Sequence, residues 1–243
     1  MRVGVVGHIA YDGLGELVRW LRAQAPTLQL ELSFESALLP IAGEGAALMG
    51  PPSTLDAMLA LGGDGTLLRA ARLLDGVPAP VFGVNLGKLG FLTTCRIEEF
   101  ADLLPRFARG ELGAEQRMAL EAQAHDEDGA VGPPLRALND VVLHKGGFAR
   151  VLRLNLTVSG EKLGLIAADG IVISTPTGST AYSLSAGGPV VEPSHESMLV
   201  TPVAAHALAI RPFILPPDAV VEVQPDDAPE EVLVTVDGQV GTK

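Results

Sequence analysis

The sequence is poor in cysteine, in positive charge and in long apolar runs. Cys95 is the single cysteine among 243 residues, so no internal disulfide can form and no cysteine cluster can bind zinc. Lys and Arg total 17 against 29 Asp and Glu, giving a formal net charge of −12. Nucleic-acid surfaces need basic patches, and a membrane span needs about eighteen apolar residues, which no run reaches. The absences predict a protein of the reducing cytoplasm that binds neither nucleic acid nor membrane, and the N-terminus has no cleavable-signal pattern.

Apolar strands alternate with helical patterns in the first half of the chain. The composition, 47% hydrophobic and 19% charged, is that of a well-packed globular protein. The predicted strands are residues 2–6, 28–39 in part, 57–61 and 80–85, and the predicted helices are 15–22, 67–74 and 97–110. Residues 43–53, rich in glycine and proline, predict a mobile connection. This order implies parallel β/α units, whose ligands bind at the carboxyl ends of the strands.

The second half of the chain contains repeated strand patterns with little helical material. Strands are predicted at 117–124, 135–143, 151–158, 163–167, 171–174, 198–203, 209–215, 220–223 and 232–236. The predicted fold is therefore an N-terminal parallel α/β domain, residues 1–112, followed by a β-rich, sandwich-like C-terminal domain, residues 113–243. The acidic run 226–231 is expected to be a solvated loop.

A glycine turn that carries one carboxylate lies between a predicted strand and a predicted helix. Its residues are Gly62-Gly63-Asp64-Gly65-Thr66. Glycine lets a ligand approach the backbone closely, and a helix N-terminus favours anions, so phosphate is the expected ligand. In that setting Asp64 would accept a proton or hold a divalent cation. The alternative is that Asp64 only makes a tight turn, and the pentapeptide leaves both interpretations open.

A second dense stretch, residues 168–189, contains the predicted strand Ile171–Ser174, which runs into a loop rich in Ser, Thr, Ala and Gly. Hydroxyl groups donate and accept hydrogen bonds, and the small residues leave room for a planar or sugar group. The alternative is an ordinary Ser/Thr-rich cap and turn. Tyr182 could stack on a ligand ring or fill a gap between strands.

These motifs together resemble the signature set of the NAD kinase family. The matching segments, in chain order, are Gly62–Thr66, Gly83-Val84-Asn85, Leu89-Gly90-Phe91-Leu92, Asn139-Asp140, 169–189 and Asp237-Gly238-Gln239. The glycine turn alone is shared with diacylglycerol and sphingosine kinases and resembles the phosphofructokinase loop. The hydroxyl-rich stretch is more specific and separates this chain from those relatives.

The resemblance implies transfer of the γ-phosphate of ATP to the 2′-hydroxyl of the adenosine ribose of NAD, with a divalent cation, expected to be Mg²⁺. Asp64 would be the general base, and the donor phosphates would lie on Gly62, Gly63, Gly65 and Thr66. NAD would contact Asp64, Gly65, Phe91, Asn139, Asp140, Asp169, Thr180, Ala181, Tyr182, Ser185 and Ala204. Within that set, Asn139 and Asp140 would hold a ribose and adenine-side groups, and Asp169 would read the nicotinamide end. The family is commonly oligomeric, which implies a dimer or tetramer.

Two other functions stay open from the sequence. A lipid or sugar kinase could use the same glycine turn, and a dinucleotide-binding protein could have kept the fold without activity. Arg69, Arg72 and Lys88 are the nearest basic residues to the turn, so metal and backbone N–H groups would carry most of the phosphate charge. Family members usually continue past the Asp-Gly-Gln turn, so a chain stopping at Lys243 is expected to be a compact version or to have lost its end.

Overall fold

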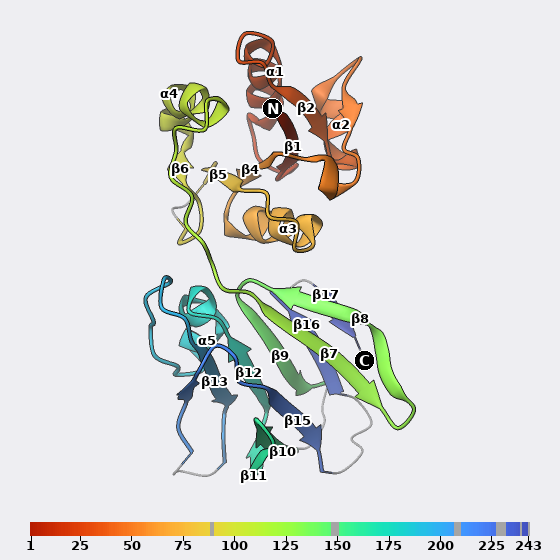
Figure 1. Cartoon of the computed structure of the whole chain (residues 1–243), viewed down its shortest axis with the longest axis vertical. Coiled ribbons are helices and arrows are strands. Elements are labelled where there is room, and N and C mark those ends of the chain that lie inside the picture. The colour runs from red at the N-terminus through yellow and green to blue at the C-terminus, as the bar shows by residue number, and fades with distance from the viewer. Residues whose placement is uncertain (88–89, 147–150, 207–209, 227–231, 239, 243) are drawn as a thin grey trace. The chain divides into compact units, whose positions relative to one another are not determined.

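The computed structural model describes the chain apart from residues 88–89, 147–150, 207–209, 227–231, 239 and 243. Lys88, Leu89, Gln239, most of the predicted acidic loop and part of the predicted strand 209–215 therefore lie outside the described residues. The chain divides into two compact units, Met1–Glu115 and Gln116–Lys243 (Figure 1), whereas the sequence placed the boundary after residue 112. No helix among the described residues is long and apolar enough to cross a membrane.

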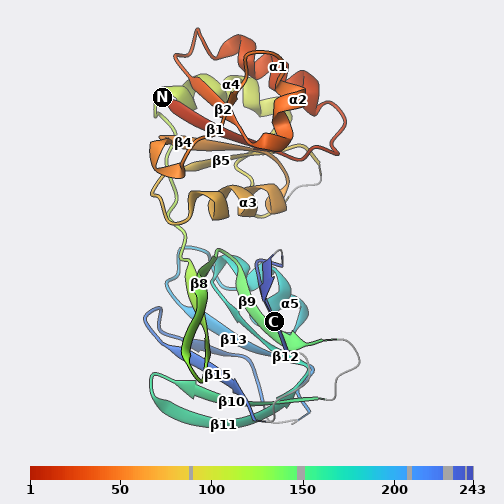
Figure 2. The same ribbon diagram turned by 90° about the vertical axis from the view of Figure 1, so that its right-hand side faces the viewer.

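The first unit is a parallel six-stranded sheet in the order β3-β2-β1-β4-β5-β6. Figure 2 shows α1 and α4 on one face of this sheet and α3 on the other. The strands are β1 (Arg2–Gly7), β2 (Glu31–Phe34), β3 (Ala47–Leu48), β4 (Ala57–Gly62), β5 (Val81–Asn85) and β6 (Cys95–Arg96). The helices are α1 (Leu14–Gln24), α2 (Leu39–Ala42), α3 (Asp64–Leu74), α4 (Ile97–Ala108) and the 3₁₀ turns η1 (Ser36–Leu38) and η2 (Pro52–Thr54).

The order of the strands places the glycine turn where ligands bind in such sheets. The chain leaves β1 toward β2 on one side and later returns to β4 on the other side of β1. The carboxyl ends of β1 and β4 therefore form the switch point of the sheet, where a crevice opens between divergent connections. Strand β4 is buried at every residue, as expected for a central parallel strand, and it ends at Gly62.

Part of one predicted connection is paired into the sheet of this unit. Residues 43–53 were predicted to be a mobile connection, but Ala47 and Leu48 pair in parallel with Ser33 and Phe34 as the edge strand β3. The Met49 N–H extends this contact by donating to the Phe34 carbonyl at 2.8 Å. Backbone pairing to β2, which local composition does not encode, orders this segment.

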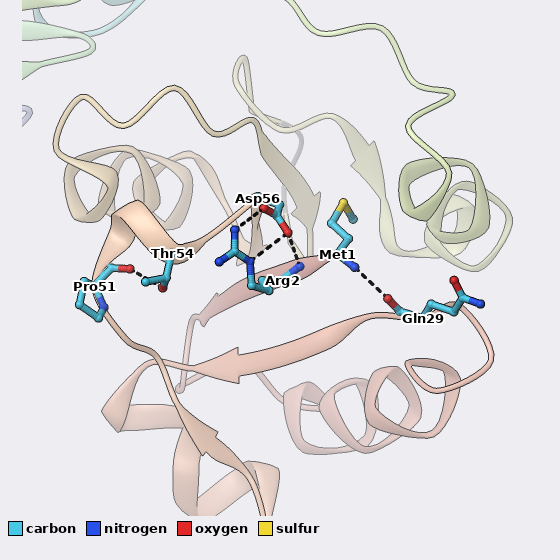
Figure 3. A network of polar contacts seen from close by, with 6 residues as sticks. All are labelled: Met1, Arg2, Gln29, Pro51, Thr54 and Asp56. Carbon is cyan, nitrogen blue, oxygen red and sulfur yellow. Dashed lines mark hydrogen bonds and ion pairs between the residues drawn. The ribbon is translucent and has the colours of Figure 1, made fainter.

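A polar network ties the start of β1 to the segment that precedes β4 (Figure 3). The Arg2 guanidinium donates to both Asp56 carboxylate oxygens, at 2.7 and 3.3 Å, and the Arg2 backbone N–H donates at 2.7 Å. The hydrogen bond from the Arg2 side chain is the main cause that lowers the pKa of Asp56 to about 2. The N-terminal amine donates to the Gln29 carbonyl at 3.0 Å, so three neighbouring segments are fixed at this edge.

The second unit is antiparallel and β-rich, with one six-stranded sheet, one three-stranded sheet and a two-stranded ribbon. The orders are β14-β13-β12-β9-β16-β17, β11-β10-β15 and β7-β8. The strands are β7 (Leu120–Asp126), β8 (Gly129–Ala137), β9 (Asp140–Lys145), β10 (Leu152–Val158), β11 (Glu161–Ala168), β12 (Gly170–Ser174), β13 (Met198–Val203), β14 (Phe213–Leu215), β15 (Val221–Pro225), β16 (Val232–Val236) and β17 (Val240–Thr242). The turn η3 (Thr177–Thr180) and the short helix α5 (Tyr182–Ser185) follow β12.

The two larger sheets share one core, which confirms the sandwich-like prediction. Leu152, Leu154 and Leu156 of β10 pack with Ile171 of β12 and Val200 of β13, all almost fully buried. These β10 residues alternate along the strand, so one face supplies the core.

The predicted strand 135–143 is wrong as a single element. Strand β8 ends at Ala137 and β9 begins at Asp140, so Leu138 and Asn139 form a connection between two separate strands. The break lies where two residues distant in the sequence bind the backbone, as described below.

Candidate functional site

The glycine turn of the first unit is shaped by a close approach between backbone and side chain. A Cβ at Gly62 would lie 2.2 Å from Thr66 Oγ1, so no other residue fits there without movement. Gly63 caps α3 with extended backbone, and Asp64 is the first residue of that helix. A Cβ at Gly63 would meet nothing within 4 Å, and Gly65 is exposed. The turn therefore presents open backbone at a helix N-terminus, which suits phosphate.

The Asp64 carboxylate is held in place by the segment after β5. The Phe91 N–H donates to Oδ2 at 2.8 Å and the Leu92 N–H to Oδ1 at 3.1 Å. A Cβ at Gly90 would lie 2.1 Å from Oδ1, so glycine lets this segment approach. A carboxylate accepts about four hydrogen bonds, so the fixed group keeps capacity to take a proton from a substrate hydroxyl. The Phe91 side chain itself is 74% exposed.

An ion pair that sequence reasoning missed supports the end of β1 at the switch point. Arg69 Nη2, on α3, donates to Glu35 Oε1 at 2.8 Å and to the Gly7 carbonyl at 2.7 Å. Glu35 Oε1 also accepts from the Gly7 N–H at 2.8 Å. One of the few basic residues near the turn is therefore engaged in holding β1 against α3. No local pattern marks Glu35, because its partners lie 28 and 34 positions away.

In the second unit, Asn139 and Asp140 lie at the break between β8 and β9. Asp140 is buried, and burial is the main cause that raises the pKa of its carboxyl to about 6. The negative charge of Asp237 raises it further, while a hydrogen bond from the Tyr182 backbone N–H opposes the rise. The carboxylate is thus largely desolvated beside α5.

Several hydroxyls of the segment after β12 form hydrogen bonds with other groups of the protein. Ser179 Oγ donates to the Val191 carbonyl at 3.2 Å and accepts from the Val191 N–H at 3.0 Å. Ser183 Oγ lies 2.9 Å from Thr201 Oγ1, and both Ser179 and Ser183 are fully buried. These two hydroxyls are therefore occupied by partners within the protein.

The other side chains of this segment are more accessible. Thr180 and Ala181 are half-buried, Ser185 is exposed, and Tyr182 is 43% exposed. The buried hydroxyls therefore fix a loop that presents these four residues on its surface.

Asp169 and Ala204 lie at the opposite end of the sheet from Asp140. In the pairing of β9 with β12, Asp140 faces Ser174, whereas His144 faces Gly170, about 13 Å away at about 3.3 Å per residue. Asp169 directly precedes Gly170, and Ala204 (φ 48°) directly follows β13 at the same end. The structure therefore brings Asn139, Asp140 and Tyr182 together but places Asp169 and Ala204 apart from them within one copy of the chain.

Asp169 is paired with a lysine that the sequence analysis did not select. Lys145 Nζ lies 2.7 Å from Asp169 Oδ1, and both side chains are about one third exposed. Lys145 ends β9, and its backbone N–H donates to the Asp169 carbonyl at 3.2 Å. The only sequence signal for this pair was a basic residue at the end of an apolar strand.

The buried Asp140 carboxyl predicts a stability change of known sign. The pKa of Asp140 is raised in the folded state. The protonated carboxyl therefore adds to the free energy of unfolding below about pH 4, and this addition is lost as pH rises through about 6. Asp140→Asn stays neutral, so we expect it to become more stable than the wild type by up to about 3 kcal/mol as pH rises from 4 to 8. Urea unfolding at both pH values measures this, with the exposed Glu127→Gln as control. A gain that is equal at both pH values would contradict the assignment.

Two protein-family models match the chain. The ATP-NAD kinase N-terminal domain matches residues 46–112, and the ATP-NAD kinase C-terminal domain matches residues 138–243. NAD kinase of Gemmatimonas aurantiaca is 55% identical over 242 residues, covering 100% of this chain and 83% of that protein. NAD kinase of Citrifermentans bemidjiense is 40% identical over 94% of this chain and 80% of that protein.

Solved structures agree with the sequence relatives. Yeast NADH kinase complexed with NADH has a TM-score of 0.87 and 26% identity, covering all of this chain and 76% of that one. An NAD kinase from Archaeoglobus fulgidus in complex with ATP has a TM-score of 0.77 and 27% identity, covering all of this chain and 86% of that one. Fold and site thus define a two-unit protein with an acid-bearing glycine turn at a helix N-terminus. The chain belongs to the NAD kinase family.

Proposed function

We propose that this protein transfers the γ-phosphate of ATP to the 2′-hydroxyl of the adenosine ribose of NAD and so makes NADP. The observation that carries the proposal is the Asp64 carboxylate, fixed by two backbone N–H groups inside the glycine turn at the switch point. The ribose oxygen attacks the γ-phosphorus, its proton passes to Asp64, and the bond to the β–γ bridging oxygen breaks to release ADP. The relative solved with ATP supports ATP as the donor.

The phosphoryl donor and the NAD acceptor would be bound by different groups of residues. Gly62, Gly63, Gly65 and Thr66 would hold donor phosphates, with Phe91 packing against the ligand. Asn139 and Asp140 would bind a ribose and adenine-side polar groups of NAD, with Thr180, Ala181, Tyr182 and Ser185 lining the dinucleotide. This division assigns donor binding to one glycine turn and acceptor binding mainly to the turn before β9.

A divalent cation, with Mg²⁺ expected, fits the residues present. The described part of the chain holds no group of three or more His, Cys, Asp or Glu side chains that could bind a metal. Mg²⁺ in kinase sites keeps several waters and is bound largely by substrate phosphates, here those placed on the glycine turn, so it needs no cluster of protein ligands. When bound, the cation would neutralise charge on the transferring phosphoryl group.

The test is a coupled assay of NADP formation from NAD, ATP and Mg²⁺. NADP formation at the rate of ATP consumption is the expected result. Turnover of diacylglycerol, sphingosine or a sugar with no NADP would instead identify a kinase of the wider glycine-turn group. NAD binding without phosphoryl transfer would identify a non-catalytic dinucleotide-binding protein.

We further propose that the working form is a homo-oligomer, a dimer or tetramer, in the cytoplasm. Strand β11 lies at the edge of its sheet, and Leu163 and Leu165 on it are 56% and 42% exposed. Asp169 directly follows this apolar edge, at the far end of the sheet from Asp140. An association through β11 would supply Asp169 and Ala204 of one copy to the dinucleotide of another. The single buried cysteine agrees with a cytoplasmic location.

Co-expression of two variants that each have little activity tests whether one copy completes the site of another. Asp64→Asn and Asp169→Asn, each with little activity alone, are expected to recover a substantial fraction of the wild-type rate when co-expressed, because some sites then combine the intact Asp64 and Asp169. Light scattering should show a dimer or tetramer. A monomer, or no recovery from an oligomer that exchanges subunits, would contradict this arrangement.

A further inference from the structure

The backbone of Leu138–Asp140 is held by two residues from distant parts of the chain. This segment separates β8 from β9 and carries Asn139 and Asp140. Its three N–H groups and three carbonyl groups all have protein partners, and Asp237 and Thr175 supply all six. Buried backbone groups must be paired, so these two residues decide the path of the segment.

Asp237 binds one side of the segment with its carboxylate. Oδ1 accepts from the Asn139 N–H at 2.7 Å and from the Asp140 N–H at 3.2 Å, and Oδ2 accepts from the Leu138 N–H at 3.1 Å. The Asp237 N–H donates to the Asp140 carbonyl at 2.9 Å. Asp237 has φ 49°, in the left-handed region where Asp is tolerated better than most residues. It directly follows β16, whose Val236 pairs with Val141 of β9, so the sheet itself positions the carboxylate.

Thr175 binds the other side. Its hydroxyl donates to the Leu138 carbonyl at 2.6 Å, and its backbone N–H donates to the Asn139 carbonyl at 2.9 Å. Thr175 Oγ1 in turn accepts from the Gly178 N–H at 3.0 Å, and Thr175 is fully buried. A Cβ at Gly178 would lie 2.0 Å from the Asn139 carbonyl oxygen, so the η3 turn closes tightly on the segment.

We propose that Asp237 and Thr175 are positioning residues that brace the Leu138–Asp140 backbone, so that the Asn139 and Asp140 side chains are presented to the dinucleotide. The inference rests on the proposed function, because it assigns NAD to these two side chains. Asp237 suits the role because only a carboxylate offers two acceptor oxygens to three adjacent N–H groups. An asparagine would offer one oxygen, and its NH₂ group would face an N–H donor.

The test compares variants of Asp237 and of Thr175, the two residues that brace the Leu138–Asp140 backbone (the brace). We expect Asp237→Ala to raise the KM for NAD roughly 10- to 100-fold while the KM for ATP stays within about twofold, since misplacement of a binding group is costly. Thr175→Val, which loses only the hydroxyl donor, should give a smaller change in the same direction. Thr175→Ser keeps that donor and should restore the wild-type KM. Asp226→Asn removes an equal charge beside Arg153 and Asn155, away from the brace, and serves as control.

Hydrogen–deuterium exchange gives a readout that does not depend on activity. Amide exchange of residues 138–140 should accelerate in Asp237→Ala and Asp237→Asn, with the β10–β11 hairpin unchanged. Unchanged exchange at 138–140, or equal changes in the KM for NAD and for ATP, would overturn the proposal. If the wild type neither binds nor phosphorylates NAD, the proposed function and the assignment of NAD to this turn both fail, while exchange still decides whether Asp237 holds the backbone.

Discussion

Asp64→Asn is expected to lower kcat by about 10²- to 10⁴-fold, the usual contribution of a general base. The amide cannot take the proton of the ribose hydroxyl, whereas its oxygen still accepts one of the two backbone hydrogen bonds made by Asp64. The fold should therefore persist, and the KM for NAD should change little. Steady-state kinetics in the coupled NADP assay, together with a thermal melt, measures both effects.

A matched control separates loss of the base from loss of a charge. Asp102 is exposed on α4, so Asp102→Asn removes the same charge from the same unit away from the turn. Its kcat should equal that of the wild type. If Asp64→Asn kept kcat within tenfold of the wild type, another group would have to accept the proton.

Gly178→Ala is expected to abolish saturable NAD binding and to lower stability by about 1–3 kcal/mol, or more if the loop cannot move. The added methyl would lie 2.0 Å from the Asn139 carbonyl oxygen and 2.5 Å from its carbon. Both atoms belong to the backbone, so no side-chain rotation relieves the overlap, and the turn that carries Asn139 and Asp140 must shift. Calorimetric titration with NAD and urea unfolding measure the two effects.

Gly113→Ala is the control for this substitution. A Cβ there would meet nothing within 4 Å, and Gly113 is not in the left-handed region. We expect unchanged NAD binding and unchanged or slightly greater stability, because alanine restricts the unfolded chain. Normal NAD affinity in Gly178→Ala would show that the packing of η3 against Asn139 is not needed for binding.

The strand and helix periods of the sequence determined the fold class. Strand β4 is apolar throughout, β12 is apolar up to its last residue, Ser174, and α1 and α4 carry apolar residues at helical spacing, so local pattern was sufficient to find them. The strand–turn–helix geometry around Gly63 was equally local, because an apolar strand and a run of helix formers flank the glycines directly. The family resemblance then supplied candidate roles for Asp64, Asn139 and Asp140.

Only the tertiary structure decided how those candidates are held. The predicted strand 135–143 breaks because Asp237, 98 positions from Asn139, takes the N–H groups that a continuous strand would have placed in a ladder. Glu35 and Lys145 passed unnoticed because their partners are brought to them by sheet pairing and not by sequence spacing. Likewise, the hydroxyl-rich segment looked open to a ligand as a whole, whereas Ser179 and Ser183 bond to Val191 and Thr201 of the protein itself. Hydrogen bonding depends on proximity in space, and a period of 2 or 3.6 residues reports only the face of an element on which a residue lies.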